Sequence, residues 1–131
     1  MTSLEDCKDN DIEFWCFKGE YKGKCTKVYD GDTCHIIFQF GDKLTKVKVR
    51  MLGYDAPEIK SKDIEIKQKA IQARDKLREL ILDKVVTCKF GDFDKYGRVL
   101  CDIYTVEGIH VNEFMAKTFG IYGRAQYNLY D

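Results

Sequence analysis

Residues 29–33 read Tyr-Asp-Gly-Asp-Thr and residues 50–58 read Arg-Met-Leu-Gly-Tyr-Asp-Ala-Pro-Glu, and the chain is organised around the stretch that they enclose. Between them lie an apolar run rich in β-branched residues, a Gly41-Asp42 turn and a strand in which apolar and basic residues alternate. Such runs favour strands joined by tight turns. We therefore expect a small sheet that carries acidic turns at one end.

Four side chains of this stretch suit a hard cation bound beside a phosphate: Asp32, Arg50, Asp55 and Glu58. Carboxylate oxygens are the usual ligands of Ca²⁺ and Mg²⁺, while a guanidinium matches phosphate oxygens through two parallel N–H donors. A further arginine, Arg98, ends the segment Asp-Lys-Tyr-Gly-Arg and would complete a clamp. The residues alone thus favour a metal-dependent phosphodiesterase.

Each of these residues also has a purely structural interpretation. The two aspartates of residues 30–32 are common turn formers, Glu58 suits a local cap, and Arg98 suits an exposed hairpin position. Turn chemistry does not require all of these charges at once, so their co-occurrence favours a site. His35 and His110 lie outside the motifs, and we interpret them as surface or strand residues.

Charge is unevenly distributed in a chain whose formal net charge is zero. A neutral total argues weakly against nucleic-acid binding, because such domains usually carry a basic surface. Residues 1–13, however, hold five acids against Lys8 alone, a net −4, so residues 14–131 carry +4. We expect residues 1–22 to form an N-terminal extension whose acidic arm is a solvated, partly disordered tail on a mildly basic body.

At 131 residues the chain fits one domain, residues 1–131. No apolar run reaches the roughly 18 residues of a membrane span, and the first residues lack the parts of a signal peptide. None of the six cysteines forms the closely spaced pair typical of zinc sites; they are Cys7, Cys16, Cys25, Cys34, Cys88 and Cys101. We predict six reduced thiols in an intracellular, cytoplasmic protein, by default a monomer without membrane contact.

Strand-forming composition predicts five strands, at residues 25–29, 34–40, 46–51, 85–90 and 98–106. In the third, Lys46, Lys48 and Arg50 face away from the apolar side. We interpret the two lysines as a solvated face, whereas Arg50 lies nearest the acidic strand end. The Gly- and Lys-rich residues 18–24 predict a turn, after an apolar segment at residues 14–17 that forms an added strand or a flap.

Helical periodicity begins after Asp63, a suitable N-cap. Apolar residues then recur at intervals of three and four; they are Ile66, Ala70, Ala73, Leu77 and Leu80. A second, short helix is predicted at residues 111–119, with Gly120 as its left-handed stop. Three strands, a helix and two further strands predict a mainly β (α+β) fold, a five-stranded Greek-key barrel of the OB type.

These motifs resemble those of the staphylococcal nuclease-like (thermonuclease) family. Three blocks carry the similarity in the same order, residues 28–33, 49–58 and 94–98, and a Val-Asn-Glu segment at 111–113 opens the next helix. The similarity covers roughly residues 25–120. A single Asp-Gly-Asp would be a weak signal, but the conjunction is specific. The family is an OB-fold barrel that hydrolyses DNA and RNA with Ca²⁺ and leaves 3′-phosphate ends.

The resemblance implies a metal site at the two acidic segments. Asp32 and Asp55 match the metal ligands of the family, and the backbone carbonyl of Ala56 matches a third ligand. Asp30 matches an outer-shell position that contacts metal-bound water. The expected cofactor is therefore Ca²⁺.

The resemblance also implies the residues that act on the substrate. Arg50, Glu58 and Arg98 match the catalytic residues, and Lys95 and Tyr96 match contacts to the terminal phosphate of the nucleotide. The expected partners are DNA, RNA or both, in single-stranded or unpaired form. The alternative is a catalytically inactive OB-fold module that binds single-stranded nucleic acid or a protein partner, as degenerate members of the family do.

The chain departs from the family pattern in four respects. The segment after Glu58 is shorter, the cysteine-containing N-terminal extension has no counterpart, and we expect the third helix of the family to be missing. Two further tyrosines of the nucleotide pocket have no certain match, and the candidates are Tyr122, Tyr127 and Tyr130.

Overall fold

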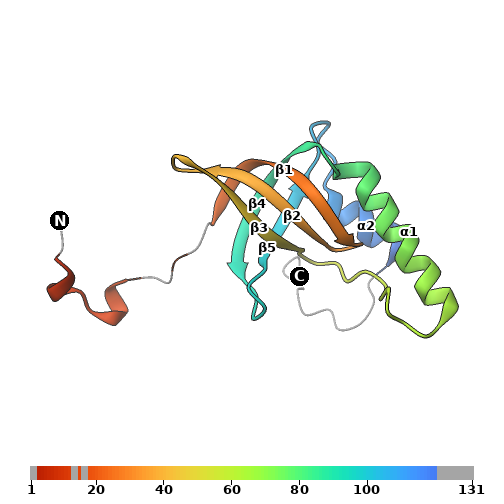
Figure 1. Cartoon of the computed structure of the whole chain (residues 1–131), viewed down its shortest axis with the longest axis horizontal. Helices are drawn as coiled ribbons and strands as arrows, with labels where there is room; N and C mark the ends of the chain where they lie inside the picture. Colours follow the sequence, from red (N-terminus) through yellow and green to blue (C-terminus); the bar gives the residue numbers. More distant parts are fainter. Residues whose placement is uncertain (1–2, 13–14, 16–17, 121–131) are drawn as a thin grey trace.

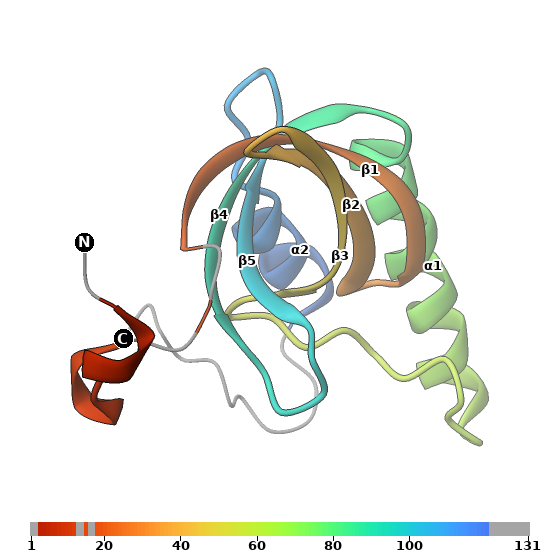
Figure 2. The same ribbon diagram turned by 60° about the vertical axis from the view of Figure 1, so that its left-hand side comes forward.

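Five strands close into a barrel in the order β1-β2-β3-β5-β4, as Figures 1 and 2 show. The computed structural model describes residues 3–12, 15 and 18–120. The strands are β1 (Gly19–Asp30), β2 (Thr33–Phe40), β3 (Lys43–Met51), β4 (Val85–Phe93) and β5 (Val99–Tyr104). Helix α1 (Ile64–Ile81) lies between β3 and β4, and α2 (Val111–Phe119) follows β5. The predicted OB-type barrel with these two helix positions is confirmed.

The first strand is longer than its composition predicted. It begins at Gly19 rather than Cys25, so the predicted turn over residues 18–24 is wrong for Gly19 onward, and the strand takes in the last residues of the predicted N-terminal extension. Barrel closure explains the difference, because residues 19–24 pair with β4, while residues 23–30 pair with β2. A Cβ on Gly23 would lie 2.5 Å from Ile36 Cγ2, so this glycine serves close packing inside a strand.

Helix α1 begins as the sequence predicted. The Asp63 side chain accepts hydrogen bonds from the backbone of Glu65 and Ile66, which satisfies two donors of the first turn. The buried stripe differs at its ends, because Ile81 is buried whereas Leu80 is only partly buried. The stripe contains Ala70, Ala73, Leu77 and Ile81. Its two alanines let the helix approach the barrel closely.

Helix α2 matches the predicted bounds and ends at Gly120. The φ of Gly120 is 76°, but its ψ of −175° lies outside the left-handed helical region that we predicted. Glycine tolerates this conformation because it has no Cβ. Neither described helix combines the length and the hydropathy that a membrane span requires.

Four cysteines of the barrel are core residues: Cys25, Cys34, Cys88 and Cys101, each 0% exposed. They and the exposed Cys7 are free thiols, as predicted, while Cys16 lies outside the described residues. Burial raises the pKa of Cys101 well above its usual value, which keeps the thiol protonated and inert. In the barrel these side chains act as small apolar residues.

The N-terminal residues that the structure describes form two short 3₁₀ turns, η1 (Leu4–Asp6) and η2 (Asp9–Asp11), with every residue exposed. They extend away from the barrel in Figure 1. Of the predicted flap at residues 14–17, only Trp15 is described. Its ring stacks on Phe93 at a centroid distance of 5.9 Å and meets the edge of Phe40 at 6.2 Å.

Asn112, at the start of α2, joins three parts of the core. Its amide oxygen accepts a hydrogen bond from the backbone N–H of Ile103 at 2.8 Å. Its amide nitrogen donates to the carbonyls of Leu52 at 3.0 Å and Cys101 at 2.9 Å. Leu52 begins the loop that contains the acidic segment after β3. The Asn112 side chain therefore anchors this loop to β5 and to α2.

We expect Asn112→Ala to lower the free energy of unfolding by about 3 kcal/mol, because buried backbone groups that lose a partner cost about 1–3 kcal/mol each. Urea denaturation followed by circular dichroism measures this loss. Asn10→Ala is the matched control, since Asn10 is exposed and should change stability by no more than about 0.5 kcal/mol. Equal values for the two variants would contradict the role of Asn112.

Candidate metal and phosphate site

The candidate site forms where the β1–β2 turn meets the end of β3. Thr33 pairs with Arg50 across β2 and β3, which places Asp32 beside the arginine. The backbone N–H of Met51 donates to the Asp32 carbonyl at 2.9 Å and ties the turn to the strand end. Strand register therefore brings together the two motifs that the sequence separates by about 20 residues.

Gly31 allows three segments to meet at this point. A Cβ at position 31 would lie 2.8 Å from the Cβ atoms of both Ala56 and Ala73. Those residues belong to the acidic loop after β3 and to α1. The glycine of the Asp-Gly-Asp motif is therefore required for close approach, and any larger residue would push the turn away from the loop and the helix.

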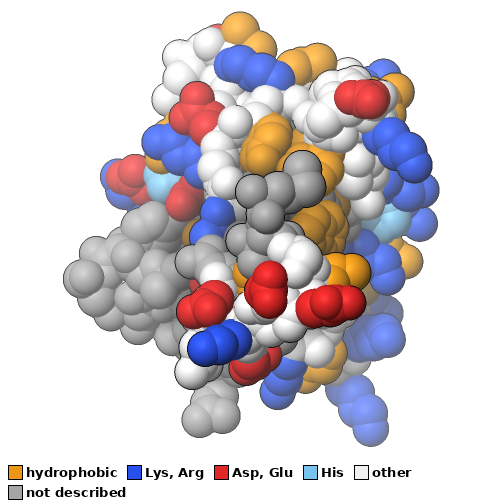
Figure 3. Space-filling model, turned by 90° about the vertical axis from the view of Figure 1, so that its left-hand side faces the viewer, with side chains coloured by type: hydrophobic (Ala, Val, Ile, Leu, Met, Phe, Trp, Pro, Cys, Tyr) orange, Lys and Arg blue, Asp and Glu red, His pale blue; other side chains and the backbone are white. Residues whose placement is uncertain are grey.

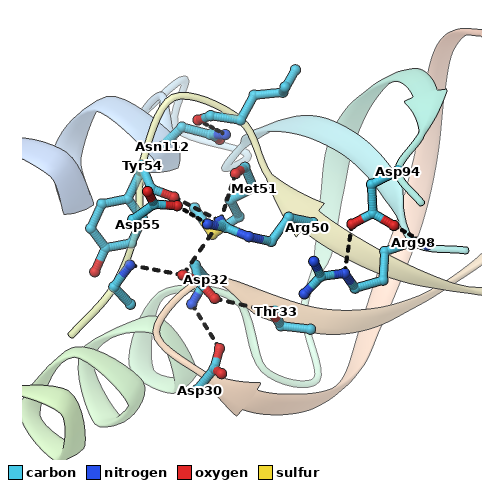
Figure 4. Close-up of polar contacts among 12 residues, drawn as sticks. Asp30, Asp32, Thr33, Arg50, Met51, Tyr54, Asp55, Asp94, Arg98 and Asn112 are labelled. Atoms are coloured by element: carbon cyan, nitrogen blue, oxygen red, sulfur yellow. Dashed lines mark hydrogen bonds and ion pairs between the residues drawn. The ribbon is translucent and has the colours of Figure 1, made fainter. Parts of the chain in front are cut away.

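Arg50 lies at the centre of the site and is only 6% exposed. Its Nη1 donates to the carbonyls of Met51 at 2.9 Å and Tyr54 at 2.7 Å. The same atom lies 3.4 Å from Asp32 Oδ2, and Nη2 is hydrogen-bonded to Asp55 Oδ1. Figure 4 shows the two carboxylates on the same guanidinium. The sequence prediction that Asp32, Arg50 and Asp55 gather at one place agrees with this geometry.

The Asp32 carboxylate is held on both oxygens. Oδ2 accepts the backbone N–H of Ala56 at 2.7 Å, and Oδ1 accepts the hydroxyl of Thr33 at 3.0 Å. Burial nevertheless raises the pKa of Asp32 to about 7, in spite of the opposing charge of Arg50. Burial also raises the pKa of Asp55 above its usual value. A buried acid, Asp32, and a partly buried one, Asp55, thus share one arginine, and a further cation would favour their ionised forms.

Asp30 closes the turn from the other side. Its Oδ1 accepts the backbone N–H of Asp32 at 3.1 Å, so Asp30 is a turn former here. It also lines an open pocket of about 220 Å³ beside the cluster. The residues that line this pocket are Tyr29, Asp30, Thr33, Lys48 and Arg98.

Arg98 reaches the site from the β4–β5 hairpin. Its Nε donates to Asp94 Oδ2 at 2.7 Å, and Asp94 Oδ1 accepts the backbone N–H groups of Tyr96 and Arg98. Asp94 thus fixes both the hairpin and the guanidinium. Figure 4 shows the Arg98 guanidinium on the side of the hairpin that faces Thr33. Its Nε contacts Asp94, and its two terminal nitrogens point away from Asp94.

Lys95 and Tyr96 lie at the tip of the same hairpin, and Tyr96 is 69% exposed. The Lys95 ammonium lies 5.2 Å from the Tyr96 ring centroid, and Arg98 Cζ lies 5.3 Å from it. The hairpin therefore presents an aromatic face and two cations to solvent next to the pocket lined by Arg98.

Glu58 lies in the loop after β3 and is exposed. Its backbone carbonyl accepts the N–H of Ser61 at 3.2 Å, which turns the loop. Within the described residues, no contact joins its carboxylate to Asp32, Arg50 or Asp55. The structure brings three of the predicted residues together, and Glu58 lies further along the same loop as Asp55 without a hydrogen bond or ion pair to them in the part of the chain that is described.

The donor set at the cluster fits a hard cation. The side-chain donors are carboxylate oxygens, which Ca²⁺ prefers. Among the residues that the structure describes, no group of three or more Asp, Glu, His or Cys side chains gathers as a metal site. The two carboxylates of Asp32 and Asp55 would thus have to be completed by further oxygen donors such as water, which is common for calcium.

Sequence reasoning missed Lys48 and Tyr29 as residues of the site. Both line the pocket with Arg98, although Lys48 was interpreted as part of a solvated face. Asn112 was noted only as part of a motif, and its role as a buried link is a finding of the structure. Strand register would have indicated Lys48, because it lies two residues before Arg50 on the same side of β3.

Comparisons with known proteins identify the family of the chain. A family model described as staphylococcal nuclease homologue matches residues 48–130. A protein of Escherichia coli described as an uncharacterized endonuclease is 32% identical over 106 residues, which cover 81% of this chain and 63% of that protein. Endonuclease YhcR of Bacillus subtilis is 34% identical over 109 residues, 76% of this chain and 9% of that protein. The chain spans less than two thirds of the length of these relatives.

Proposed function

Because the chain belongs to the family of staphylococcal nuclease homologues, we propose that it is a calcium-dependent endonuclease that hydrolyses phosphodiester bonds of DNA, RNA or both and leaves 3′-phosphate ends. The observation that carries the proposal is the convergence of Asp32 and Asp55 on Arg50. Related proteins of Escherichia coli and Bacillus subtilis are described as endonucleases, which supports the same reaction class.

Asp32, Asp55 and the carbonyl of Ala56 would hold the calcium ion, with Asp30 contacting its bound water. When bound, the ion supplies Lewis-acid polarisation of a phosphate oxygen and positions water. The chain prepares this site in two ways. Backbone and hydroxyl donors orient the Asp32 carboxylate, and burial makes its charge costly without a cation nearby.

Arg50 and Arg98 would stabilise the charge that develops on the phosphoryl oxygens, since fixed donors are most effective where charge grows. Each guanidinium is already oriented by the chain, Arg50 by two backbone carbonyls and Arg98 by Asp94. Glu58 would accept a proton from the attacking water. Lys95 and Tyr96 would contact the terminal phosphate from the hairpin.

The decisive experiment incubates the purified protein with 5′-labelled single-stranded DNA and RNA in calcium or in EGTA. We expect shortened products in calcium, no products in EGTA, and recovery when calcium is added back. A 3′-phosphatase should change the mobility of the products. The Asp32→Asn/Asp55→Asn variant, which keeps side-chain size, should be inactive and excludes a contaminating nuclease.

Two outcomes would contradict the proposal. Cleavage that persists in EGTA would exclude the metal. An intact strand that is retarded on a native gel, without products in calcium, would indicate the alternative, a module that binds nucleic acid without cutting it.

A further inference from the structure

The outer face of β1, β2 and β3 carries two rows of lysines. Lys27 pairs with His35 and His35 with Lys48, and Lys24 pairs with Ile37 and Ile37 with Lys46. All four lysines are exposed. Two residues of rise separate the rows, about 7 Å along the strands. We call this surface the cationic face; its residues are Lys24, Lys27, Tyr29, His35, Lys46 and Lys48.

The strand segments that carry the cationic face contain no acidic residue. Residues 24–29, 33–40 and 43–51 contain no acid, although the whole chain has equal numbers of acidic and basic residues. Within the described residues, none of the four lysines takes part in an ion pair. Burial lowers the pKa of His35, and the nearby charges of Lys27, Lys46 and Lys48 lower it further. Like charges therefore concentrate at one place on the barrel.

The space-filling view agrees with this concentration. Figure 3 shows lysine and arginine side chains crowded around a histidine at the right-hand edge, while acidic side chains gather at the front of the molecule. An asymmetric surface on a neutral chain attracts an anionic partner to one side.

The cationic face is continuous with the candidate site. Lys48 and Tyr29 belong to the face and also line the pocket that Arg98 and Asp30 share. Tyr29 is 54% exposed. The Lys27 ammonium lies 4.6 Å from its ring centroid, and the His35 ring lies 5.7 Å away. An aromatic ring framed by cations suits a base that stacks while its phosphates meet lysines.

We propose that the cationic face binds the part of a single-stranded polynucleotide that flanks the scissile phosphate, with a base stacked on Tyr29 and the backbone phosphates along the two lysine rows. The inference rests on the proposed function, because it takes the neighbouring pocket as the place of cleavage. A single strand is favoured over a duplex because Tyr29 needs an unpaired base. Charge complementarity and continuity with the pocket favour this occupant.

Binding of a fluorescent single-stranded oligonucleotide of about 16 nucleotides, the upper end of the site sizes of small barrels, tests the proposal in EGTA, where no cleavage is expected. The variant Lys27→Gln/Lys46→Gln removes one lysine from each row and leaves the pocket residues intact. It should flatten the slope of log K against log salt by about 1.4, since each phosphate contact on a single strand contributes about 0.7. Affinity at about 0.1 M salt should fall by about 10-fold or more.

Lys67→Gln/Lys117→Gln is the matched control, with the same loss of charge at exposed positions of α1 and α2. It should leave the slope nearly unchanged. Tyr29→Leu should weaken binding by about 10-fold, the lower part of the range for a stacked base, without changing the slope. Comparing the affinities of the unmodified protein for DNA and RNA oligonucleotides of the same sequence shows which sugar is preferred.

Cleavage of a dinucleotide in calcium separates this proposal from the proposed function. The Lys27→Gln/Lys46→Gln variant should cut the dinucleotide at the unmodified rate but lose activity on the longer strand at low concentration. If the slope of log K against log salt were unchanged in that variant, the proposed role of the cationic face would be wrong even if the protein is a nuclease. Stronger binding of anionic lipid vesicles than of oligonucleotide would also overturn it. A protein that binds the strand through these lysines but never cuts would overturn only the proposed function.

Discussion

Replacing Glu58 with glutamine is expected to slow phosphodiester cleavage by about 10²–10⁴-fold, the usual contribution of a general base. Glutamine keeps the shape of the side chain but cannot accept a proton at neutral pH. The loop position of Glu58 makes the test clean, because within the described residues its carboxylate holds no other group in place. Initial rates on single-stranded DNA at saturating calcium measure the effect.

The fold of the variant should be unaffected by this change. Glu65→Gln is the matched control, since Glu65 is exposed in the first turn of α1. Both variants should unfold within about 0.5 kcal/mol of the unmodified protein, the range of surface substitutions. If Glu58→Gln cleaved as fast as Glu65→Gln, Glu58 would have no part in the reaction.

The result also bears on the position of the loop. Because Glu58 is exposed and, within the described residues, its carboxylate makes no hydrogen bond or ion pair with the cluster, proton transfer would pass through a substrate or a water that contacts both. A loss in kcat would assign Glu58 to the chemical step, whereas a loss in KM alone would assign it to binding.

Local chemistry explains why most of the fold could be predicted. Asp63 caps α1 through its own side chain, and Gly120 ends α2 with a positive φ. Alternating apolar residues in β3 point to the core as expected, with Val47, Val49 and Met51 all buried. Each of these signals depends on residues close together in the sequence, so it can be recognised from the sequence alone.

Signals that depend on distant partners could not be predicted. The composition of residues 19–24 predicted a turn. These residues form a strand because they pair with β4 when the barrel closes, and this pairing has no signal in the local sequence. The specific motifs predict which residues belong to the candidate site, but the burial of Arg50 between two acids was visible only in the structure.

That burial makes Arg50 the residue whose loss should affect stability and activity together. In Arg50→Gln, the buried carboxylate of Asp32 and the partly buried carboxylate of Asp55 would lose the cation that they share. Removing one partner of a buried ion pair costs about 3–5 kcal/mol, so in EGTA we expect the free energy of unfolding to fall by about 3 kcal/mol. Cleavage in calcium should fall by about 10²–10³-fold, as for the loss of one fixed donor at the developing charge.

The matched control is Arg74→Gln, because Arg74 forms only an exposed ion pair with Asp75 at 3.2 Å on α1. Such pairs contribute about 0–1 kcal/mol, so this variant should resemble the unmodified protein in both measurements. Urea denaturation with and without calcium provides the stability readout, and initial cleavage rates provide the other. Equal stability of the two variants in EGTA would show that Arg50 does not compensate the buried acids.

Calcium should separate the two roles of Arg50. If the ion binds between Asp32 and Asp55, it supplies the positive charge that the variant lacks, so calcium should restore much of the lost stability of Arg50→Gln by binding only the folded state. It should not restore cleavage, because the guanidinium that we propose to stabilise the charge on the phosphoryl oxygens is still absent. If calcium restored the stability of Arg50→Gln but not its activity, the metal and the arginine would share one site and have different roles there. Stability that does not respond to calcium would remove the ion from these two carboxylates.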